Sequence, residues 1–443
     1  MLKIGRNTLL LAWFCTLAWE APMAQSKPVS KVSGHDQLKM VVIVSRHGVR
    51  SPTWVQERLD SYSALPWPKW SVPPGNLTDR GYELMKQFGS FDRATLAKEG
   101  LFAGHGCEDA SKTYIWADTD QRTIASGKAL AEGLFPGCPP QVHSLAADEN
   151  DLLFHPTANG VKAAQADAAF AEFAARAKRE SDAQQNELLE EMQHVLLACE
   201  PKIACTSART PAKPLLGVAT APVRGKGDHI VDLEGPLPQG SSFAEDLLLE
   251  YADGMPMDQV GWGKVDEPQL RRFLALHSDY FDLMHRTPAL ARLEASNMLF
   301  HIVRTLQQSV EQKPIVDAIG PINNQLVVFA GHDTNLAGIA ALLGLHWSLD
   351  GRDDDTPPGT ELAFELLQDN HGAYLIRVTV AMQTLRQLRD MPNLTAAAPP
   401  SHAILTLPGC RVDAKVCGWD DFLHLADDAI DSSDIFPFSP THP

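Results

Sequence analysis

Three apolar runs, each leading into a polar turn, constrain the fold of this chain more than any other feature. They are LKMVVIV (38–44), KTYIWAD (112–118) and NQLVVFAG (324–331). Continuous runs rich in β-branched residues are typical of strands buried on both faces of a parallel sheet. Helix-periodic segments follow the second and third runs, over residues 119–134 and 332–344. The pattern predicts an α/β fold with a parallel sheet.

The middle of the chain has a different character. Residues 146–289 contain long, Ala-rich, helix-periodic segments, interrupted by a Pro- and Gly-containing stretch (201–240) that we expect to be an irregular connector with little helix. After Gly359, TELAFELLQ and AYLIRVTVAMQTL are expected to form a hairpin that extends the sheet. We therefore predict a discontinuous α/β domain (36–145 and 290–443) interrupted by a helical insertion domain.

Composition narrows the classes of protein to consider. The chain has 443 residues, of which 44% are apolar and 21% charged, as in ordinary globular proteins. Its formal net charge of −17 argues against a nucleic-acid partner, because little positive charge is available to neutralise a phosphate backbone. If the ligand is an anion, its attraction must come from a local cluster of cations.

The first residues have the pattern of a secretory signal. Lys3 and Arg6 precede an apolar stretch over residues 9–19, and small residues follow near Ala24. Such a stretch is too short to span a bilayer, and a buried core helix is the poorer alternative because packing does not explain the leading charges. We expect a signal peptide over residues 1–26, a periplasmic or secreted protein, and no membrane partner.

Cysteine usage agrees with export. Six cysteines remain once Cys15 in the signal segment is set aside, an even number that fits disulfide bonds in an exported chain. Several connectivities are open, and neither short-spaced pair has the spacing of a zinc site. Because neighbouring cysteines close local loops, we expect the pairs Cys107 with Cys138, Cys199 with Cys205, and Cys410 with Cys417.

Charged side chains follow each of the three apolar runs. Ligands of open α/β sheets bind beyond the carboxyl ends of the strands, so residues at these three positions are expected to meet in one crevice. A lone Arg or an isolated His-Asp pair is usually a solvated surface feature, whereas R-H-G-x-R arises by chance in roughly one chain per thousand. The residues that would meet are Arg46, His47, Arg50, Asp118, Arg122, His332 and Asp333.

This set of side chains fits phosphoryl transfer. Guanidinium groups match phosphate oxygens and neutralise the charge of the group in transit. A neutral imidazole, here His47, is a good nucleophile toward phosphorus, and Gly48 would let backbone amides approach the anion. Asp333 is the acid placed to protonate the departing alkoxide. We infer that His47 receives a phosphoryl group held by arginines.

The motifs RHGVRSPT, GHDTNLAG and DTPPGTELAFELL resemble those of the histidine acid phosphatases, branch 2 of the histidine phosphatase superfamily, and among them the bacterial periplasmic phytases. The similarity runs from about Leu38 to Cys417. It implies a phosphoglycerate-mutase-like fold, in which a mixed, mostly parallel sheet is flanked by helices and carries an inserted helical domain. We expect a monomer that uses no cofactor and no metal.

The resemblance also implies residue roles, position by position. His47 becomes the phosphorylated nucleophile and Asp333 the proton donor. Substrate-binding roles fall to Arg46, Arg50, Arg122 and His332 at the phosphate, Thr53 in its pocket, Asp118 at its mouth, and Glu245 and His277 in the helical segments.

The resemblance is incomplete at one position that bears on the substrate. Trp54 stands where enterobacterial phytases carry a lysine, although Gly48 and the HDTN motif are phytase-like. The expected function is an acid phosphomonoesterase, specifically a phytase that hydrolyses inositol hexakisphosphate through a phosphohistidine. The alternatives are a broad-specificity acid phosphatase, a glucose-1-phosphatase, or a non-enzymatic phosphate-binding protein. A phosphoglycerate mutase is disfavoured by the signal segment and the paired cysteines.

Overall fold

The computed structural model describes six stretches of the chain. Cys199, Cys205 and the predicted signal segment lie outside them. Within these stretches every helix is too short or too polar to cross a membrane. The described residues are 36–102, 106–178, 183–198, 213–227, 229–410 and 415–438.

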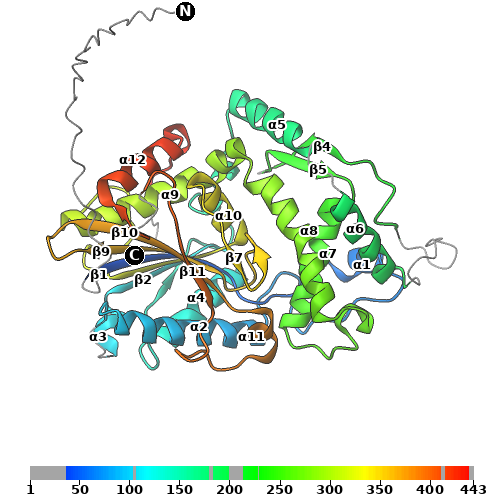
Figure 1. Ribbon diagram of the computed structural model, residues 1–443, viewed down its shortest axis with the longest axis horizontal. Helices are drawn as coiled ribbons and strands as arrows, with labels where there is room; N and C mark the ends of the chain where they lie inside the picture. Colours follow the sequence, from blue (N-terminus) through cyan, green and yellow to red (C-terminus); the bar gives the residue numbers. More distant parts are fainter. Residues whose placement is uncertain are drawn as a thin grey trace, which may run out of the picture.

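A mixed sheet forms the centre of the molecule (Figure 1), which confirms the predicted fold class. Its strand order is β11-β10-β9-β1-β6-β2-β3, and β12 pairs with β10. The neighbours from β1 to β3 are parallel, whereas β9 to β12 add antiparallel pairs. The strands are β1 (Gln37–Arg46), β2 (Thr113–Ala117), β3 (Val142–His143), β6 (Leu326–Gly331), β9 (Glu361–Gln368), β10 (Tyr374–Met382), β11 (Ser401–Leu405) and β12 (Cys417–Gly418).

The register of the parallel strands aligns their carboxyl ends. Arg46 of β1 pairs with Gly331 of β6, and Ala117 of β2 pairs with Ala330 of β6. The residues that follow these three strands therefore emerge at one edge of the sheet. The predicted hairpin after Gly359 is confirmed as β9 and β10, and β9 pairs directly with β1.

Helices cover both faces of the sheet and form two hydrophobic cores. On one face, Val42 and Val44 of β1 pack with residues of α9, α10 and α12. On the other, Val41 and Ile43 pack with residues of α2 and α4. The alternation of neighbouring β1 residues between two cores explains why this strand has a continuous apolar sequence. These helices are α2 (Asp79–Lys98), α4 (Gln121–Leu134), α9 (Pro288–Glu311), α10 (Asp333–Leu342) and α12 (Trp419–Ala429).

A separate group of helices lies beside the sheet (Figure 1) and packs around its own apolar core, which includes Phe243 and Phe273. The expected irregular connector (201–240) is partly wrong, because its described part contains the hairpin β4–β5 and the start of α7. Each strand has only four residues, too few to show a clear alternation. The elements are α1 (Gln56–Asp60), α5 (Ala163–Ala177), α6 (Ala183–Leu196), β4 (Ala221–Arg224), β5 (Val231–Glu234), α7 (Pro236–Ala252) and α8 (Glu267–His285).

Short elements complete the part of the chain that the structure describes, and two disulfides within this part connect its loops. Cys107 bonds to Cys138 and Cys410 to Cys417, as expected. The short elements are α3 (Cys107–Ala110), the 3-10 turns η1 (Pro156–Asn159), η2 (Val260–Gly263) and η3 (Ser432–Asp434), β7 (Ser348–Leu349), β8 (Arg352–Asp353) and α11 (Leu385–Asp390).

Candidate active site

The structure brings the polar residues at the three strand ends together. Arg46 is the last residue of β1, Asp118 directly follows β2, and His332 and Asp333 directly follow β6. Arg46 Nη2 lies 2.7 Å from Asp333 Oδ2, and His332 Nε2 lies 2.6 Å from Asp118 Oδ2. The rings of His47 and His332 are 5.7 Å apart between centroids. The parallel register of β1, β6 and β2 thus assembles one cluster.

The imidazole of His47 is buried and held in one tautomer. Its Nδ1 lies 2.9 Å from the carbonyl oxygen of Gly48. Because a carbonyl only accepts hydrogen bonds, Nδ1 carries the proton and Nε2 keeps its lone pair. Burial lowers the pKa of His47 well below its usual range, and the nearby guanidinium groups, led by Arg122, lower it further. The ring is therefore neutral in mild acid, as a nucleophile must be.

Three arginines beside His47 each keep one buried donor without a partner. Arg46 is 1% exposed and Arg50 is 7% exposed, while the side chain of Arg122 is 19% exposed. The Nε atom of each has no hydrogen-bond partner among the described residues. A buried donor left unpaired costs about 1–3 kcal/mol, and a bound oxyanion would supply the missing acceptors. The three unpaired donors make this cluster a candidate site for an oxyanion.

Glu245 reaches this site from α7. Its carboxylate forms ion pairs with Arg46 and with Arg50, whose Nη2 lies 2.8 Å from Glu245 Oε2. Burial raises the pKa of Glu245, but the attraction of the two arginines outweighs it, so the pKa is lowered and the carboxylate is ionised. Glu245 thus engages the terminal nitrogens of both guanidinium groups, whereas their Nε atoms remain unpaired.

Asp333 is the first residue of α10, where the helix dipole favours a carboxylate. Its Oδ1 accepts a hydrogen bond from the Thr334 backbone N–H at 2.9 Å. Burial, the largest influence, raises the pKa of Asp333, and so does Glu245, but Arg46 together with His277 and His332 lowers it more, so the net shift is downward. The group is therefore ionised while Arg46 pairs with it, and it gains a proton more readily when an anion occupies that guanidinium.

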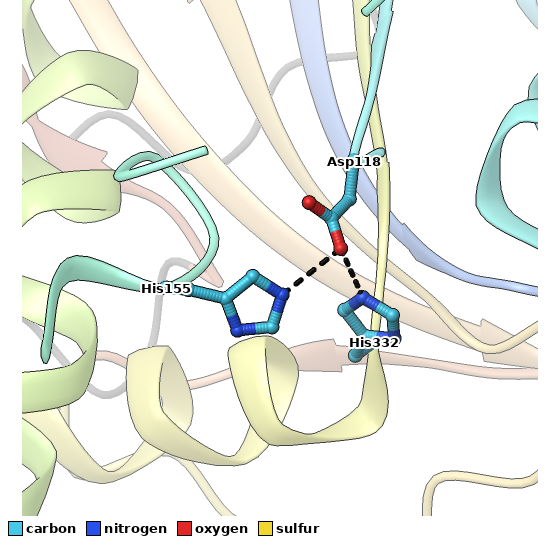
Figure 2. Close-up of side chains that lie close together, drawn as sticks. All are labelled: Asp118, His155 and His332. Carbon is cyan, nitrogen blue, oxygen red and sulfur yellow. Dashed lines mark hydrogen bonds and ion pairs between the residues drawn. The ribbon is translucent and has the colours of Figure 1, made fainter. Parts of the chain in front are cut away.

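Asp118 joins two imidazoles through one oxygen atom (Figure 2). Its Oδ2 lies 2.6 Å from His332 Nε2 and 2.9 Å from His155 Nε2. Burial raises the pKa of Asp118, but the hydrogen bonds from both histidines lower it overall, so the carboxylate is ionised. The other ring nitrogen of His332 faces Arg122, with Nδ1 3.5 Å from Nη2. Burial lowers the pKa of His332, the hydrogen bond to Asp118 opposes this, and the shift remains downward.

Sequence reasoning did not identify His155. It lies in LLFHPT, before the turn η1, and no motif or periodic pattern distinguishes it there. Its position becomes apparent only when the turn folds against the ends of β2 and β6.

Two further predicted residues lie at the margin of the cluster. His277 of α8 is buried, its Nδ1 is 3.1 Å from Ser241 Oγ, and its Nε2 has no partner among the described residues. Ligand atoms of His277, Glu245 and Asp333 lie within 4.8 Å of one another. Thr53 is exposed and lies beside Gly75. A Cβ on that glycine would be 3.7 Å from both Thr53 Cγ2 and Arg122 Nη1, so Thr53 lies close to the arginine.

The expectation that Gly48 brings its backbone amide close to an anion is wrong. Its N–H donates to Ser126 Oγ at 2.9 Å, so this amide does not face an anion. A Cβ on Gly48 would lie 2.7 Å from Met85 Cγ and 2.8 Å from the Gly81 carbonyl oxygen. The residue is therefore small because α2 packs against it.

Among the described residues, two groups of side chains have ligand atoms close enough to share a metal ion. Each contains histidine and carboxylate, and within each the ligand atoms lie within 4.8 Å of one another. Hydrogen bonds and arginine ion pairs already account for most of these donors. The absence of a metal requirement remains a prediction. The groups are Asp118 with His155 and His332, and Glu245 with His277 and Asp333.

Comparison with known proteins gives the same picture. The sequence profile of the histidine phosphatase superfamily (branch 2) matches residues 37–381. Phytase AppA of Escherichia coli is 34% identical over 95% of this chain and 96% of its own length. A glucose-1-phosphatase of Salmonella typhimurium is 30% identical over 87% of this chain and 91% of its own length.

The fold agrees with a solved structure over most of this chain. The phytase of Hafnia alvei, solved in complex with myo-inositol hexakis sulphate, superimposes with a TM-score of 0.78 at 33% identity. The match covers 92% of this chain and 100% of that one.

Proposed function

Because this chain belongs to the histidine phosphatase superfamily, branch 2, we propose that it is an acid phosphomonoesterase that hydrolyses inositol hexakisphosphate through a phosphohistidine. The observation that carries the proposal is the set of three orphan guanidinium donors beside a neutral, buried imidazole. The phytases of E. coli and Hafnia alvei support the substrate class.

The first step transfers the phosphoryl group to His47. The substrate phosphate takes the free Nε donors of the arginines, and His47 Nε2 attacks phosphorus while Nδ1–H remains on the Gly48 carbonyl. The bond from phosphorus to the ester oxygen breaks, and that oxygen takes a proton from Asp333. Anion binding at Arg46 raises the pKa of Asp333, which makes the carboxyl group an acid in the complex.

The second step hydrolyses the phosphohistidine and regenerates the free enzyme. Asp333, now a carboxylate, takes a proton from water, the water oxygen bonds to phosphorus, and the bond to His47 Nε2 breaks. Thr53 is proposed to line the phosphate pocket, and Glu245 and His277 are proposed to contact the rest of the substrate. We also propose export to the periplasm, which is consistent with the leading charges and apolar stretch of residues 1–26.

A glucose-1-phosphatase or general acid phosphatase is the second candidate, favoured by one structural feature. Trp54, one residue after Thr53, packs edge-on against Phe243 of α7, and the Arg58 guanidinium carbon lies 3.5 Å from the centre of its ring. The indole itself carries no cation, and the Arg58 guanidinium covers one of its faces, so the rest of its surface is apolar. Such a surface suits a less highly charged substrate than inositol hexakisphosphate.

A substrate panel tests the proposal. Phosphate release is measured from phytate, glucose 1-phosphate and p-nitrophenyl phosphate between acid and neutral pH with a chelator present, and His47→Ala serves as the blank. Acid-side release from phytate that disappears in the variant supports the phytase. Release from the small esters alone supports the second candidate, and release from none of them contradicts a phosphatase.

A further inference from the structure

A turn over residues 151–155 presents His155 to the active-site carboxylate Asp118. Hydrogen bonds hold this turn to strand β2 and to helix α10. Trp116 of β2 donates its Nε1–H to Asp151 Oδ2 at 2.7 Å. Asn335 of α10 donates its side-chain N–H to the Phe154 carbonyl oxygen at 3.0 Å.

The same turn also contacts the residue before His332. Phe154 is 3% exposed, and a Cβ on Gly331 would lie 2.7 Å from its ring. The Phe154 ring therefore packs directly against the end of β6. His155 is held against Asp118 by contacts that its own side chain does not make.

The shared oxygen of Asp118 couples the two imidazoles. A neutral His332 that donates its Nε2–H to Asp118 has only a lone pair on Nδ1, which repels a phosphate oxygen. To donate from Nδ1 as well, His332 must take a second proton, and the negative charge of Asp118 stabilises that cation. A second donor on the same Oδ2 atom, His155 Nε2 at 2.9 Å, withdraws part of that charge.

We propose that His155 is a positioning residue that acts through Asp118 and sets how readily His332 takes the second proton it needs to donate to a bound phosphate. The proposal rests on the proposed function only in naming phosphate as the anion. It predicts that removing the donor at position 155 extends anion binding to higher pH.

Other charged groups face His155, Asp118 and His332, and they also contribute to the pH dependence of anion binding. They stay unchanged in variants of His155, so a difference between variants reports position 155. These groups are Asp120 and Arg122 at the start of α4, His47 after β1, Asp333 at the start of α10, and Asp151 in the turn.

Two variants of His155 separate the effect of its hydrogen bond to Asp118 from the effect of its ring. Its side chain is 38% exposed, so replacement leaves the cores intact. His155→Phe keeps a planar ring without a donor, whereas His155→Gln keeps an N–H donor that does not titrate. His371→Gln, an exposed histidine in the β9–β10 turn, is the matched control.

The readout is calorimetric binding of inorganic sulfate across pH, because sulfate keeps its charge throughout and all pH dependence belongs to the protein. We expect the pH at which affinity falls by half to rise by about 0.5–1 unit in His155→Phe, and to remain near the wild-type value in His155→Gln and His371→Gln. An unchanged midpoint in His155→Phe, or an equal rise in His155→Gln, overturns the proposal.

The same proteins distinguish this inference from the proposed function. If the wild type hydrolyses none of the three esters, the phosphatase assignment fails, while the shift in sulfate binding still tests the role of His155. If the esters are hydrolysed and the sulfate midpoint does not move, the enzyme stands and the role of His155 is refuted.

Discussion

Replacement of Asp333 by asparagine tests two roles of this side chain: donation of a proton to the leaving group, and the negative charge that pairs with Arg46. The side chain keeps its size at the start of α10 but loses both its charge and the proton it would donate. Inositol leaves as an alkoxide that needs this proton, whereas p-nitrophenolate leaves readily without it. We expect kcat for phytate to fall by roughly 10²–10⁴, the range of general acid catalysis, and kcat for p-nitrophenyl phosphate to fall much less.

The same variant should bind inorganic phosphate more tightly. Asp333 Oδ2 lies 2.7 Å from Arg46 Nη2, and unit charges about 4 Å apart attract by about 4 kcal/mol at an effective dielectric constant near 20. Glu245 pairs with the same nitrogen, so only part of this attraction becomes available to the anion. A gain of about 1–2 kcal/mol corresponds to phosphate inhibition roughly 5–30-fold tighter.

The assay compares kcat for the two esters and the inhibition constant of phosphate in wild type, Asp333→Asn and Asp120→Asn. Asp120 is the control because it also pairs with an arginine, 2.6 Å from Arg122 Nη2, but lies on the β2 side of the site. We expect Asp120→Asn to lose little kcat on either ester. Equal losses of kcat on both esters in Asp333→Asn, or full turnover of phytate, refute the assigned role.

Three further predictions concern pH and stability. Activity persists far into acid, because the lowered pKa of His47 keeps its ring neutral, and a pH series with chelator is expected to show no metal dependence. Burial raises the pKa of Asp92, which faces Glu361, to about 7, so its contribution to stability is complete below the unfolded value near pH 4 and is lost as pH rises through 7. By urea denaturation, the free energy of unfolding of Asp92→Asn is therefore expected to be about 2 kcal/mol higher than that of wild type at pH 8, with no such gain at pH 4. Gly48→Ala is expected to lower the free energy of unfolding by about 1–3 kcal/mol, because its Cβ meets the Gly81 carbonyl oxygen, and an unchanged denaturation midpoint contradicts this.

Local patterns made the strand-end residues predictable. The apolar run of β1 alternates between two cores, so its sequence alone indicates a central strand, and the polar residues after it fall at the sheet edge. Gly48 could not be interpreted in the same way. Its neighbours Met85 and Gly81 come from α2, and the sequence does not specify which helix packs against that turn.

The residue that helix α7 contributes to the site, Glu245, was predictable only through the resemblance to the histidine acid phosphatases. Within α7, Glu245, Asp246 and Glu250 look alike in sequence. Burial raises the pKa of Asp246 and of Glu250 to about 8, whereas Glu245 is ionised because two arginines from another element pair with it. The charge state of each acid depends on partners distant in sequence, which no local pattern encodes.

The charge balance around His47 explains why such a site favours acid. Three arginines face four carboxylates, so the carboxylates outnumber the cations by one before an anion arrives. A phosphate ester adds up to two negative charges to a buried region, where uncompensated charge is costly. Protons on Asp333 and His332 relieve that excess, and both place a donor toward the substrate. Binding and catalysis are thus coupled to proton uptake by the same two groups, so acid favours both. The residues in this balance are Arg46, Arg50 and Arg122 against Asp118, Asp120, Glu245 and Asp333.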